Sequence, residues 1–419
     1  MKTTGLLLGI LICSFSLFGN TIHRKYDVLI QNADSLYRVK DFKYSAFTFS
    51  EAFKALDAKI TIDHRYNAAC SWALSNYPDS AFFHLNYITT CMNYTNYGHI
   101  NADPDLISLY KDKRWKPLLE NVLANKKKAF PNLDLIAVNG FKVEMASYGM
   151  ENNHKGKPVI VFENGRGTDF EYWITVIKEV SKENATFAYN RPRIGCSEDD
   201  NQLPTIGHIV EVLRQSLLAK GLYPPYLLVG HSWGAAYVRY FATLYPNEIA
   251  GLIFVDPHDF VKKEGGGRLP YREIGLRENQ IDSLFAVYDK WADEYIARGP
   301  KFVVEEMKAQ REFSKTGYEL CNRNPLPDVP VHFIKAGGYP LNPEQTATLY
   351  DRKKMFRINN NIQMESWLEL INPLKYGKFF YCSNSGHFIQ KDDPDIIISS
   401  IKLALGDYSK IRKEKETGR

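Results

Sequence analysis

At 419 residues the chain is longer than a single hydrophobic core usually fills, so we expect two domains. Its hydrophobic content of 44% and charged content of 24% are ordinary for a globular protein. The net charge of +5 is modest and no long basic stripe accompanies it, which excludes nucleic-acid binding from the expected functions.

The N-terminus has the layout of a secretory signal peptide. Lys2 precedes an apolar run over residues 5–18, which is too short to span a bilayer comfortably. We predict a signal peptide over residues 1–20, with a retained N-terminal anchor as the alternative. Lipidation of Cys13 is disfavoured because Ile12 stands where a small residue is expected. The protein is therefore expected to be exported to the periplasm, the envelope or the medium, without membrane contact beyond this segment.

A helical pattern with an internal repeat occupies residues 21–129. Similar residue types recur at an offset of 35 residues: Ala33 with Ala68, Tyr37 with Trp72, Asp41-Phe42 with Asn76-Tyr77, and Ala46-Phe47 with Ala81-Phe82. The offset resembles the tetratricopeptide period of about 34 residues, so we predict a small all-α domain of that kind. Two such units cannot bury their faces alone. We expect packing against the second domain, self-association or a protein partner, with a plain helical spacer as the alternative.

From Pro131 onward, short β-type runs alternate with amphipathic helical patterns. Strands are predicted over 140–148, 159–163, 186–190, 226–230, 251–256, 331–335 and 378–382, and helices over 170–182, 206–220, 233–245, 363–372 and 394–405. Several strands are continuously apolar, as in Leu252–Val255, which suits a parallel sheet covered on both faces. The alternation predicts a doubly wound α/β domain over residues 130–407, followed by a charged tail over 408–419.

The segment 257–329 is too long for a loop between two strands. Helical patterns over residues 281–298 and 302–313 predict a helical cap inserted beside the sheet. Aromatic residues of the cap, among them Tyr288 and Trp291, recur near helical spacing. Core packing is the preferred interpretation of these residues, and an apolar acyl pocket is the alternative.

The sequence Gly-His-Ser-Trp-Gly at residues 230–234 matches Gly-x-Ser-x-Gly, a pattern that arises by chance in roughly one in ten chains of this length. Its context is more specific, because the buried strand Tyr226–Val229 leads into it and a helical pattern follows from Ala235. Such a sharp strand-to-helix turn exposes the serine hydroxyl, and the flanking glycines avoid collisions. We predict that Ser232 is a nucleophile; the alternative is a serine that only caps a tight turn.

Besides this turn, the sequence contains three further recognisable segments. They are a strand and glycine loop over Val159–Gly167, a turn over Tyr189–Ser197, and a histidine loop over Ser385–Ile389. Together and in this order, the segments resemble the landmarks of the α/β-hydrolase family over residues 131–407. The resemblance implies an α/β-hydrolase fold, with a mostly parallel sheet and a helical cap, and a serine hydrolase mechanism.

His387 is the general base that the resemblance implies. A serine hydroxyl is a poor nucleophile until a neighbouring imidazole accepts its proton. Among the ten histidines, His387 alone lies in a glycine-flanked loop after the final predicted strand. His231 lies inside the turn and is expected to support it, and His258, near the end of a strand, is the second candidate.

The acid that would orient the histidine is less well defined. Family members usually carry it after the strand that corresponds to Val331–Lys335, but no carboxylate follows that strand before Glu344. A second known location is the end of the preceding strand, where Asp256 stands. We choose Asp256, and Glu344 and Asp259 remain alternatives. Asp256 also has a purely structural interpretation, as the Asp-Pro that often ends this strand.

The expected oxyanion hole consists of two backbone N–H groups. One belongs to Trp233, directly after the serine, and the other to Arg166, next to Gly165 in the glycine loop. This loop departs from the family pattern, because Glu163-Asn164 stands where His-Gly is common. Asn164 and Arg166 either add donors, bind an acidic substrate group or brace the loops, and bracing is the preferred interpretation.

The leading functional prediction is hydrolysis of a small-molecule carboxylic ester or related acyl compound through an acyl-enzyme. Serine at the turn argues against epoxide hydrolysis and dehalogenation, for which this fold uses aspartate. The resemblance also admits an aminopeptidase of the proline-iminopeptidase type. A non-catalytic hydrolase-fold protein, whose helical module recruits a partner, is the other class. The sequence has no metal-ligand spacing, phosphate-binding glycine loop or dinucleotide fingerprint, so we predict no cofactor and no metal.

Overall fold

The computed structural model describes residues 25–55, 60–261, 267–339 and 349–417. The predicted signal peptide, Cys13 and Glu344 lie outside these ranges. Within them, no helix combines the length and the apolar character that crossing a membrane requires. The chain divides into two compact units, Met1–Pro131 and Asn132–Arg419.

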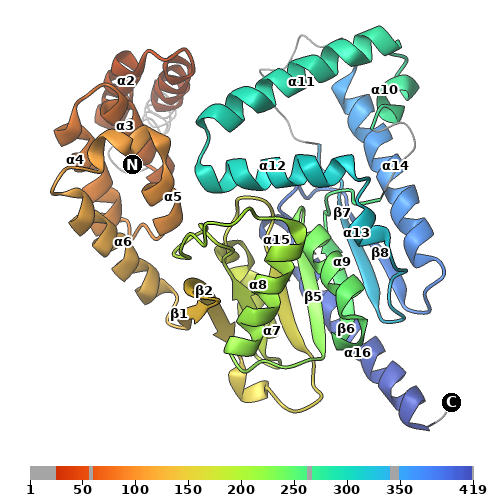
Figure 1. Ribbon diagram of the computed structural model, residues 1–419. Coiled ribbons are helices and arrows are strands. Elements are labelled where there is room, and N and C mark those ends of the chain that lie inside the picture. Colours follow the sequence, from red (N-terminus) through yellow and green to blue (C-terminus); the bar gives the residue numbers. More distant parts are fainter. Residues whose placement is uncertain (1–24, 56–59, 262–266, 340–348, 418–419) are drawn as a thin grey trace, which may run out of the picture. The chain divides into compact units, whose positions relative to one another are not determined.

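In its described part, the N-terminal unit consists of helices and their connections (Figure 1). A helix over residues 25–38 is followed by α2 (Phe42–Ala55), α3 (Ile62–Leu74), α4 (Pro78–Cys91), α5 (Tyr97–Ala102), the 3-10 helix η1 (Pro104–Leu109) and α6 (Trp115–Ala129). The prediction of an N-terminal helical module is confirmed.

The 35-residue offset corresponds to two consecutive helical hairpins. Ala33 and Ala68 lie on the first helix of each hairpin, Ala46 and Ala81 lie on the second, and all four side chains are fully buried. Small side chains at these places let the helices approach closely, and α3 packs against both α2 and α4. Binding of a partner by this module stays a prediction.

The C-terminal unit is built on an eight-stranded sheet with the order β1-β2-β4-β3-β5-β6-β7-β8. The strands are β1 (Leu133–Val138), β2 (Phe141–Tyr148), β3 (Val159–Glu163), β4 (Thr186–Tyr189), β5 (Tyr226–His231), β6 (Ile249–Val255), β7 (Val331–Ala336) and β8 (Gly377–Cys382). β2 pairs antiparallel with both β1 and β4, whereas every pair from β4 to β8 is parallel. The carboxyl ends of these parallel strands therefore meet at one edge of the sheet.

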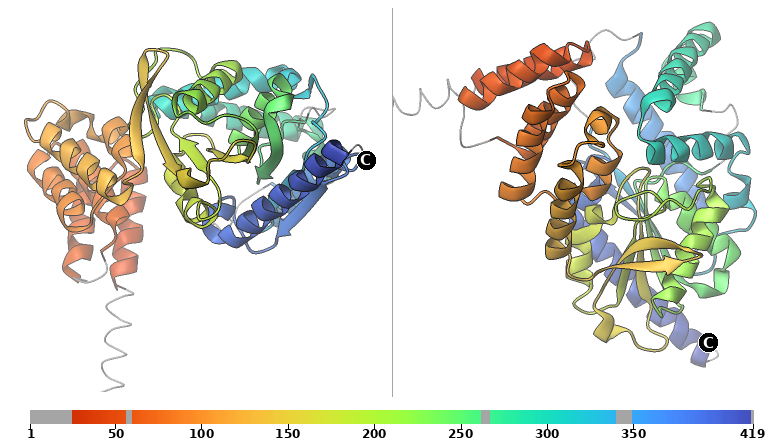
Figure 2. Two further views of the ribbon diagram at one scale, coloured as in Figure 1. Left: turned by 90° about the horizontal axis from the view of Figure 1, so that it is seen from below. Right: turned by 60° about the vertical axis from the view of Figure 1, so that its left-hand side comes forward.

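Helices cover both faces of this sheet (Figures 1 and 2). On one face lie α8 (Ile206–Ala219), α9 (Gly234–Leu244) and α14 (Arg352–Ile371), and on the other lie α7 (Ile174–Val180) and α16 (Pro394–Thr417). Every residue of β3, β5 and β6 is buried, which explains their continuously apolar runs. The predicted doubly wound α/β domain is confirmed.

Two elements of this unit differ from the predictions. Strand β1 was not predicted; it pairs only with β2, and most of its side chains are partly exposed, so its sequence lacks a buried apolar run. Helix α14 begins at Arg352 and not at residue 363, because Asp351 caps it by accepting the backbone N–H of Lys354 at 3.0 Å. Its first turns are rich in basic and amide side chains, which hide the helical period.

The predicted end of the last helix at residue 405 is wrong. Helix α16 continues through Thr417, so most of the predicted charged tail over residues 408–419 belongs to this helix. Its last turns carry charge pairs along the helix, Lys410 with Asp407 at 2.7 Å and Arg412 with Glu416 at 3.3 Å. Pairs at this spacing favour a helix without an apolar stripe.

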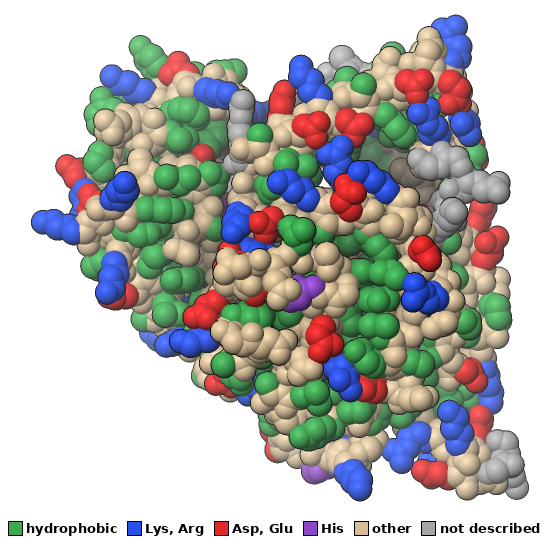
Figure 3. Space-filling view, in the orientation of Figure 1, with side chains coloured by type: hydrophobic (Ala, Val, Ile, Leu, Met, Phe, Trp, Pro, Cys, Tyr) green, Lys and Arg blue, Asp and Glu red, His purple; other side chains and the backbone are tan. Residues whose placement is uncertain are grey.

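The helical cap lies between β6 and β7. It contains α10 (Leu269–Glu273), α11 (Glu278–Arg298), α12 (Lys301–Lys315) and α13 (Glu319–Asn322). Charged side chains of both signs mingle over α11 and α12 (Figure 3), and Arg311 joins these helices by pairing with Asp289 and Asp293. Core packing does not explain Tyr288 and Trp291, which are 70% and 52% exposed.

Candidate active site

Ser232 lies on a sharp turn between β5 and α9. Its φ is +52°, in the left-handed region that residues other than glycine rarely adopt. A Cβ atom added to Gly234 would lie 2.4 Å from the carbonyl oxygen of Asn164, and one added to Gly230 would lie 2.8 Å from that of Gly234. The two glycines are therefore required by close backbone contacts, and the serine between them is held with its hydroxyl at the carboxyl edge of the sheet.

A chain of hydrogen bonds joins Ser232, His387 and Asp256. The Nε2 atom of His387 lies 3.0 Å from Oγ of Ser232, and its Nδ1 atom lies 2.6 Å from Oδ2 of Asp256. His387 comes from the loop after β8 and is about half exposed, whereas Asp256 is buried directly after β6. Three segments far apart in the sequence thus meet, in the arrangement that lets an imidazole accept a serine proton.

The carboxylate of Asp256 has two further partners on its other oxygen. Oδ1 accepts hydrogen bonds from Nζ of Lys335 at 2.8 Å and from the backbone N–H of Ala336 at 3.1 Å. Burial alone would raise the pKa of Asp256, but the hydrogen bond to His387 and the charge of Lys335 outweigh it, and the pKa is lowered. The carboxyl group is therefore held in its charged form.

Lys335 belongs to no recognised motif and was not predicted as a site residue. It lies on β7 within the buried segment Val-His-Phe-Ile-Lys-Ala, and its own side chain is buried. A lysine in such a strand needs a buried counter-charge, and that need was a signal for an acid nearby.

The other histidines near the serine have different contacts. His231 is buried, and its Nε2 atom lies 2.8 Å from the backbone carbonyl oxygen of His387, so it braces the histidine loop. Burial and the nearby His387 lower the pKa of His231 to about 3. The Nε2 atom of His258 lies 2.9 Å from the hydroxyl of Tyr318, and burial lowers the pKa of His258 to about 4.

Of the two alternative acids, the structure describes Asp259, which does not contact His387. Asp259 accepts the backbone N–H of Val261 at 3.2 Å, whereas Asp256 contacts the imidazole of His387. Glu344 lies outside the described residues.

The glycine loop after β3 touches the serine turn. A Cβ atom added to Gly165 would lie 3.4 Å from Cβ of Ser232 and 2.8 Å from Nδ1 of His231. In the part of the chain that the structure describes, the backbone N–H groups of Arg166 and Trp233 donate no hydrogen bond to another protein group. Both are therefore available as donors to an oxygen atom in front of Ser232.

A pocket of about 420 Å³ opens at Ser232. The lining residues are Gly165, Arg166, Thr168, His231, Ser232, Trp233, His258, Tyr288, Gln310, His387 and Phe388. Tyr288 and Gln310 come from the cap helices, and Nη1 of Arg166 donates to Oε1 of Gln310 at 2.6 Å. Among these lining residues there is a cationic side chain, Arg166, but no carboxylate.

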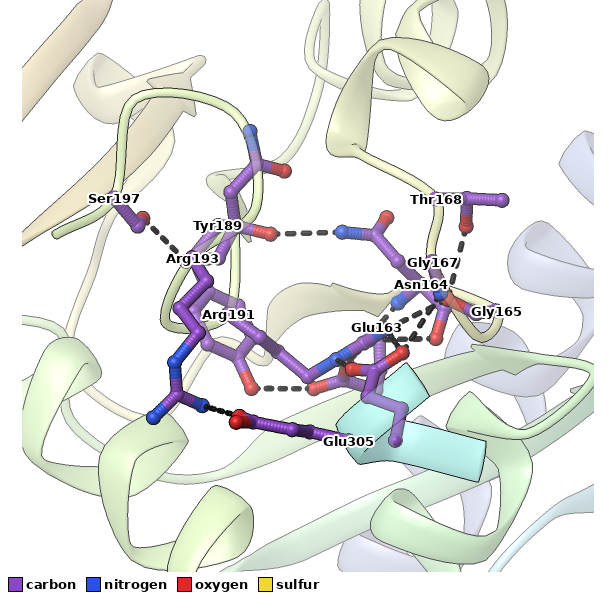
Figure 4. Close-up of polar contacts among 12 residues, drawn as sticks. Glu163, Asn164, Gly165, Gly167, Thr168, Tyr189, Arg191, Arg193, Ser197 and Glu305 are labelled. Carbon is purple, nitrogen blue, oxygen red and sulfur yellow. Dashed lines mark hydrogen bonds and ion pairs between the residues drawn. The ribbon is translucent and has the colours of Figure 1, made fainter. Parts of the chain in front are cut away.

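A buried cluster of charges lies beneath the glycine loop (Figure 4). Arg191 donates to Glu163 at 2.6 Å and to Glu306 of α12 at 2.6 Å, and the hydroxyl of Tyr189 donates to Glu163 at 2.7 Å. Arg191, Glu163 and Glu306 are at most 3% exposed. Burial raises the pKa of Glu163 even though the charge of Arg191 lowers it. The departure Glu163-Asn164 in the glycine loop therefore has a bracing role, and Glu306 was missed because it comes from the cap.

Within the described residues, one group of side chains has metal-ligating geometry, Cys70, Asp103 and Asp105 of the N-terminal unit. Hydrogen bonds already engage these carboxylates, from Tyr66 to Asp103 and from Tyr37 to Asp105. We therefore assign no metal to this group.

In a comparison with known protein families, residues 158–350 match the family described as "alpha/beta hydrolase fold". A stretch of 98 residues is 36% identical to the uncharacterized protein YqjL of Bacillus subtilis, covering 23% of this chain and 39% of that one. Another stretch of 126 residues is 29% identical to a proline iminopeptidase of Heyndrickxia coagulans, covering 29% of this chain and 42% of that one. The chain thus spans about two fifths of the length of these curated relatives.

Solved structures with a similar fold include two that cover most of the C-terminal unit. One is DBJA, with a TM-score of 0.47 and 14% identity over 67% of this chain and 98% of that one. The other is a loop variant of the haloalkane dehalogenase DbeA from Bradyrhizobium elkanii, with a TM-score of 0.42 and 14% identity over 68% of this chain and 99% of that one.

Proposed function

Because the C-terminal unit of this chain is an α/β-hydrolase domain, we propose that the protein is a serine hydrolase that cleaves carboxylic esters or related acyl compounds. The observation that carries the proposal is the hydrogen-bonded chain from Ser232 through His387 to Asp256. A buried carboxylate, an imidazole and a hydroxyl in this order are suited to acyl transfer through a covalent intermediate.

In the proposed reaction, Oγ of Ser232 attacks the carbonyl carbon of the ester while Nε2 of His387 takes the hydroxyl proton. The carbonyl oxygen becomes an oxyanion and accepts hydrogen bonds from the backbone N–H groups of Trp233 and Arg166. When the carbon–oxygen bond to the alcohol breaks, His387 returns the proton to the leaving alcohol. Water then attacks the acyl-enzyme with His387 as the base, releasing the acid and restoring Ser232.

Asp256 holds the Nδ1–H of His387 so that Nε2 faces the serine, and its charge stabilises the imidazolium that forms. The contacts of Oδ1 with Lys335 and Ala336 leave Oδ2 aimed at His387. The positive charge of Lys335 thereby partly neutralises the negative charge of Asp256 next to the imidazole of His387.

An aminopeptidase of the proline-iminopeptidase type is the second candidate, favoured by the partial match to such an enzyme. A substrate of that class presents an amino group, whose positive charge needs an anionic partner when it is buried. The lining of the pocket offers the cation Arg166, and no carboxylate is among its described residues. This charge arrangement supports the ester over the aminoacyl substrate.

The experiment that tests the proposed function compares wild type and Ser232→Ala on 4-nitrophenyl esters of two to eight acyl carbons and on prolyl and alanyl 4-nitroanilides. We expect at least one ester to be cleaved by the wild type more than about 10⁴ times faster than by the variant. Cleavage of the anilides alone would favour the aminopeptidase. Absence of turnover on the whole panel would favour a non-catalytic binding protein.

A further inference from the structure

The glycine loop is held from below by the guanidinium group of Arg191 (Figure 4). Nη2 donates to the carbonyl oxygen of Gly165 at 2.7 Å, and Nη1 donates to that of Asn164 at 2.8 Å. The carbonyl of Gly165 also accepts the hydroxyl of Thr168 at 3.0 Å. Two successive carbonyl groups of the loop are thus directed toward the buried arginine.

The direction of one carbonyl fixes the direction of the next N–H. In a trans peptide unit, the C=O of one residue and the N–H of the following residue lie in one plane and point in opposite directions. The bond between Gly165 and Arg166 is not among the cis bonds of the described chain. The hydrogen bond from Arg191 directs the carbonyl of Gly165 toward the protein interior. The N–H of Arg166 must therefore point away from the interior, toward the pocket that Arg166 and Ser232 line.

The cap helix α12 completes this arrangement. Oε2 of Glu306 accepts the backbone N–H of Gly167 at 2.7 Å, and Oε1 accepts Nε of Arg191 at 2.6 Å. One carboxylate from the cap therefore holds both the glycine loop and the arginine beneath it. One turn further along α12, Gln310 contacts the side chain of Arg166 at 2.6 Å.

We propose that Arg191 and Glu306 are positioning residues that aim the Arg166 N–H at the oxyanion, so that cap helix α12 sets the geometry of the reaction centre. The inference rests on the proposed function and assigns a further task to the cap, which otherwise only covers the pocket. Displacement of α12 turns the Gly165–Arg166 peptide and removes one of the two donors.

Glu306 is the better residue to change. Replacing Arg191 would leave the buried carboxylates of Glu163 and Glu306 without a cation, and such a variant is at risk of not folding. Removal of the Glu306 carboxylate leaves the pair of Arg191 with Glu163 at 2.6 Å intact. Glu305 is the matched control, because it lies on the same helix and forms an ion pair with Arg193 at 2.7 Å instead of contacting the glycine loop.

The test measures the second-order rate constant with which a fluorophosphonate labels wild type, Glu306→Ala, Glu306→Gln and Glu305→Ala. The phosphonyl oxygen occupies the place of the oxyanion, so the rate reports the donors directly. We expect a decrease of about tenfold or more for Glu306→Ala and less than about twofold for Glu305→Ala. Glu306→Gln should show an intermediate decrease, because its amide oxygen can accept the Gly167 N–H while its N–H₂ group faces the Nε donor of Arg191. With a cleaved ester, the decrease should appear in kcat and not in KM.

Equal rates for wild type and Glu306→Ala, or equal decreases in the two alanine variants, would overturn the positioning role and leave the proposed function standing. Thermal unfolding of each variant separates a loss of the donor from a loss of the fold. If Glu306→Ala does not fold, Glu306→Gln with an unchanged melting temperature and an unchanged kcat would contradict the proposal as well. No labelling of the wild type would overturn the proposed function and, with it, this inference.

Discussion

Asp256→Asn is expected to lower kcat on a cleaved ester by about 10⁴-fold and also to lower the melting temperature, because Lys335 loses its buried counter-charge. Asparagine is close to aspartate in shape but carries no charge, and its amide can present N–H₂ to Nδ1 of His387. The imidazole then favours the wrong tautomer and loses its charge partner 2.6 Å away. Steady-state kinetics of the purified variant, with circular dichroism of its fold, measures both effects.

Asp259→Asn and Glu344→Gln are the matched comparisons for this result. Because Asp256 already occupies the place of the acid beside Nδ1 of His387, we expect both of these variants to keep kcat within about threefold of wild type. If either variant loses as much activity as Asp256→Asn is expected to lose, or if Asp256→Asn stays active, the assignment of the acid is wrong.

Lys335→Met is expected to move the acidic limb of the kcat/KM profile to higher pH by about one unit or more. In wild type the buried carboxylate of Asp256 has a cation 2.8 Å away, and its pKa is lowered. Without that cation, the pKa of Asp256 rises, because burial is no longer offset by the charge of Lys335, and the carboxylate becomes neutral at a higher pH. Since the proposed reaction needs the charged carboxylate to stabilise the imidazolium of His387, activity below the shifted limb falls.

Lys378→Met supplies the control for this shift. Lys378 lies on the neighbouring strand β8 and pairs with Asp407, away from the serine, so its removal tests a lost ion pair outside the site. We expect a profile like that of wild type, measured with the same ester from pH 5 to pH 9. An unchanged profile for Lys335→Met, or equal shifts in both variants, would contradict the role given to Lys335.

The parts of the site that are local in sequence were predictable. The turn around Ser232 requires glycine at positions 230 and 234 because backbone atoms lie within 3 Å of any added Cβ, and this need appears directly as a pentapeptide. His387 is likewise identified by a glycine-flanked loop after the last strand. The order of buried strands predicted the parallel sheet, since a strand covered on both faces shows an unbroken apolar run.

The parts that depend on contacts between distant segments were not predictable. Arg191 and Glu306 meet across 115 residues, and nothing in the helical period of α12 distinguishes Glu306 from the exposed acids of the cap. Lys335 and Asp256 are 79 residues apart, and the pairing exists only because β6 and β7 are neighbours in the sheet. Strand β1 and the charged ends of α14 and α16 were missed because tertiary contacts and ion pairs, not apolar periodicity, define them.

Mass spectrometry of the full chain after reaction with a fluorophosphonate, followed by peptide mapping, decides whether Ser232 is the nucleophile. We expect a single adduct on wild type, located on Ser232, and no adduct on Ser232→Ala. His387→Gln, which removes the base 3.0 Å from the serine oxygen, should react far more slowly than wild type. An unlabelled wild type, or an adduct that persists in Ser232→Ala, would show that Ser232 is not the nucleophile.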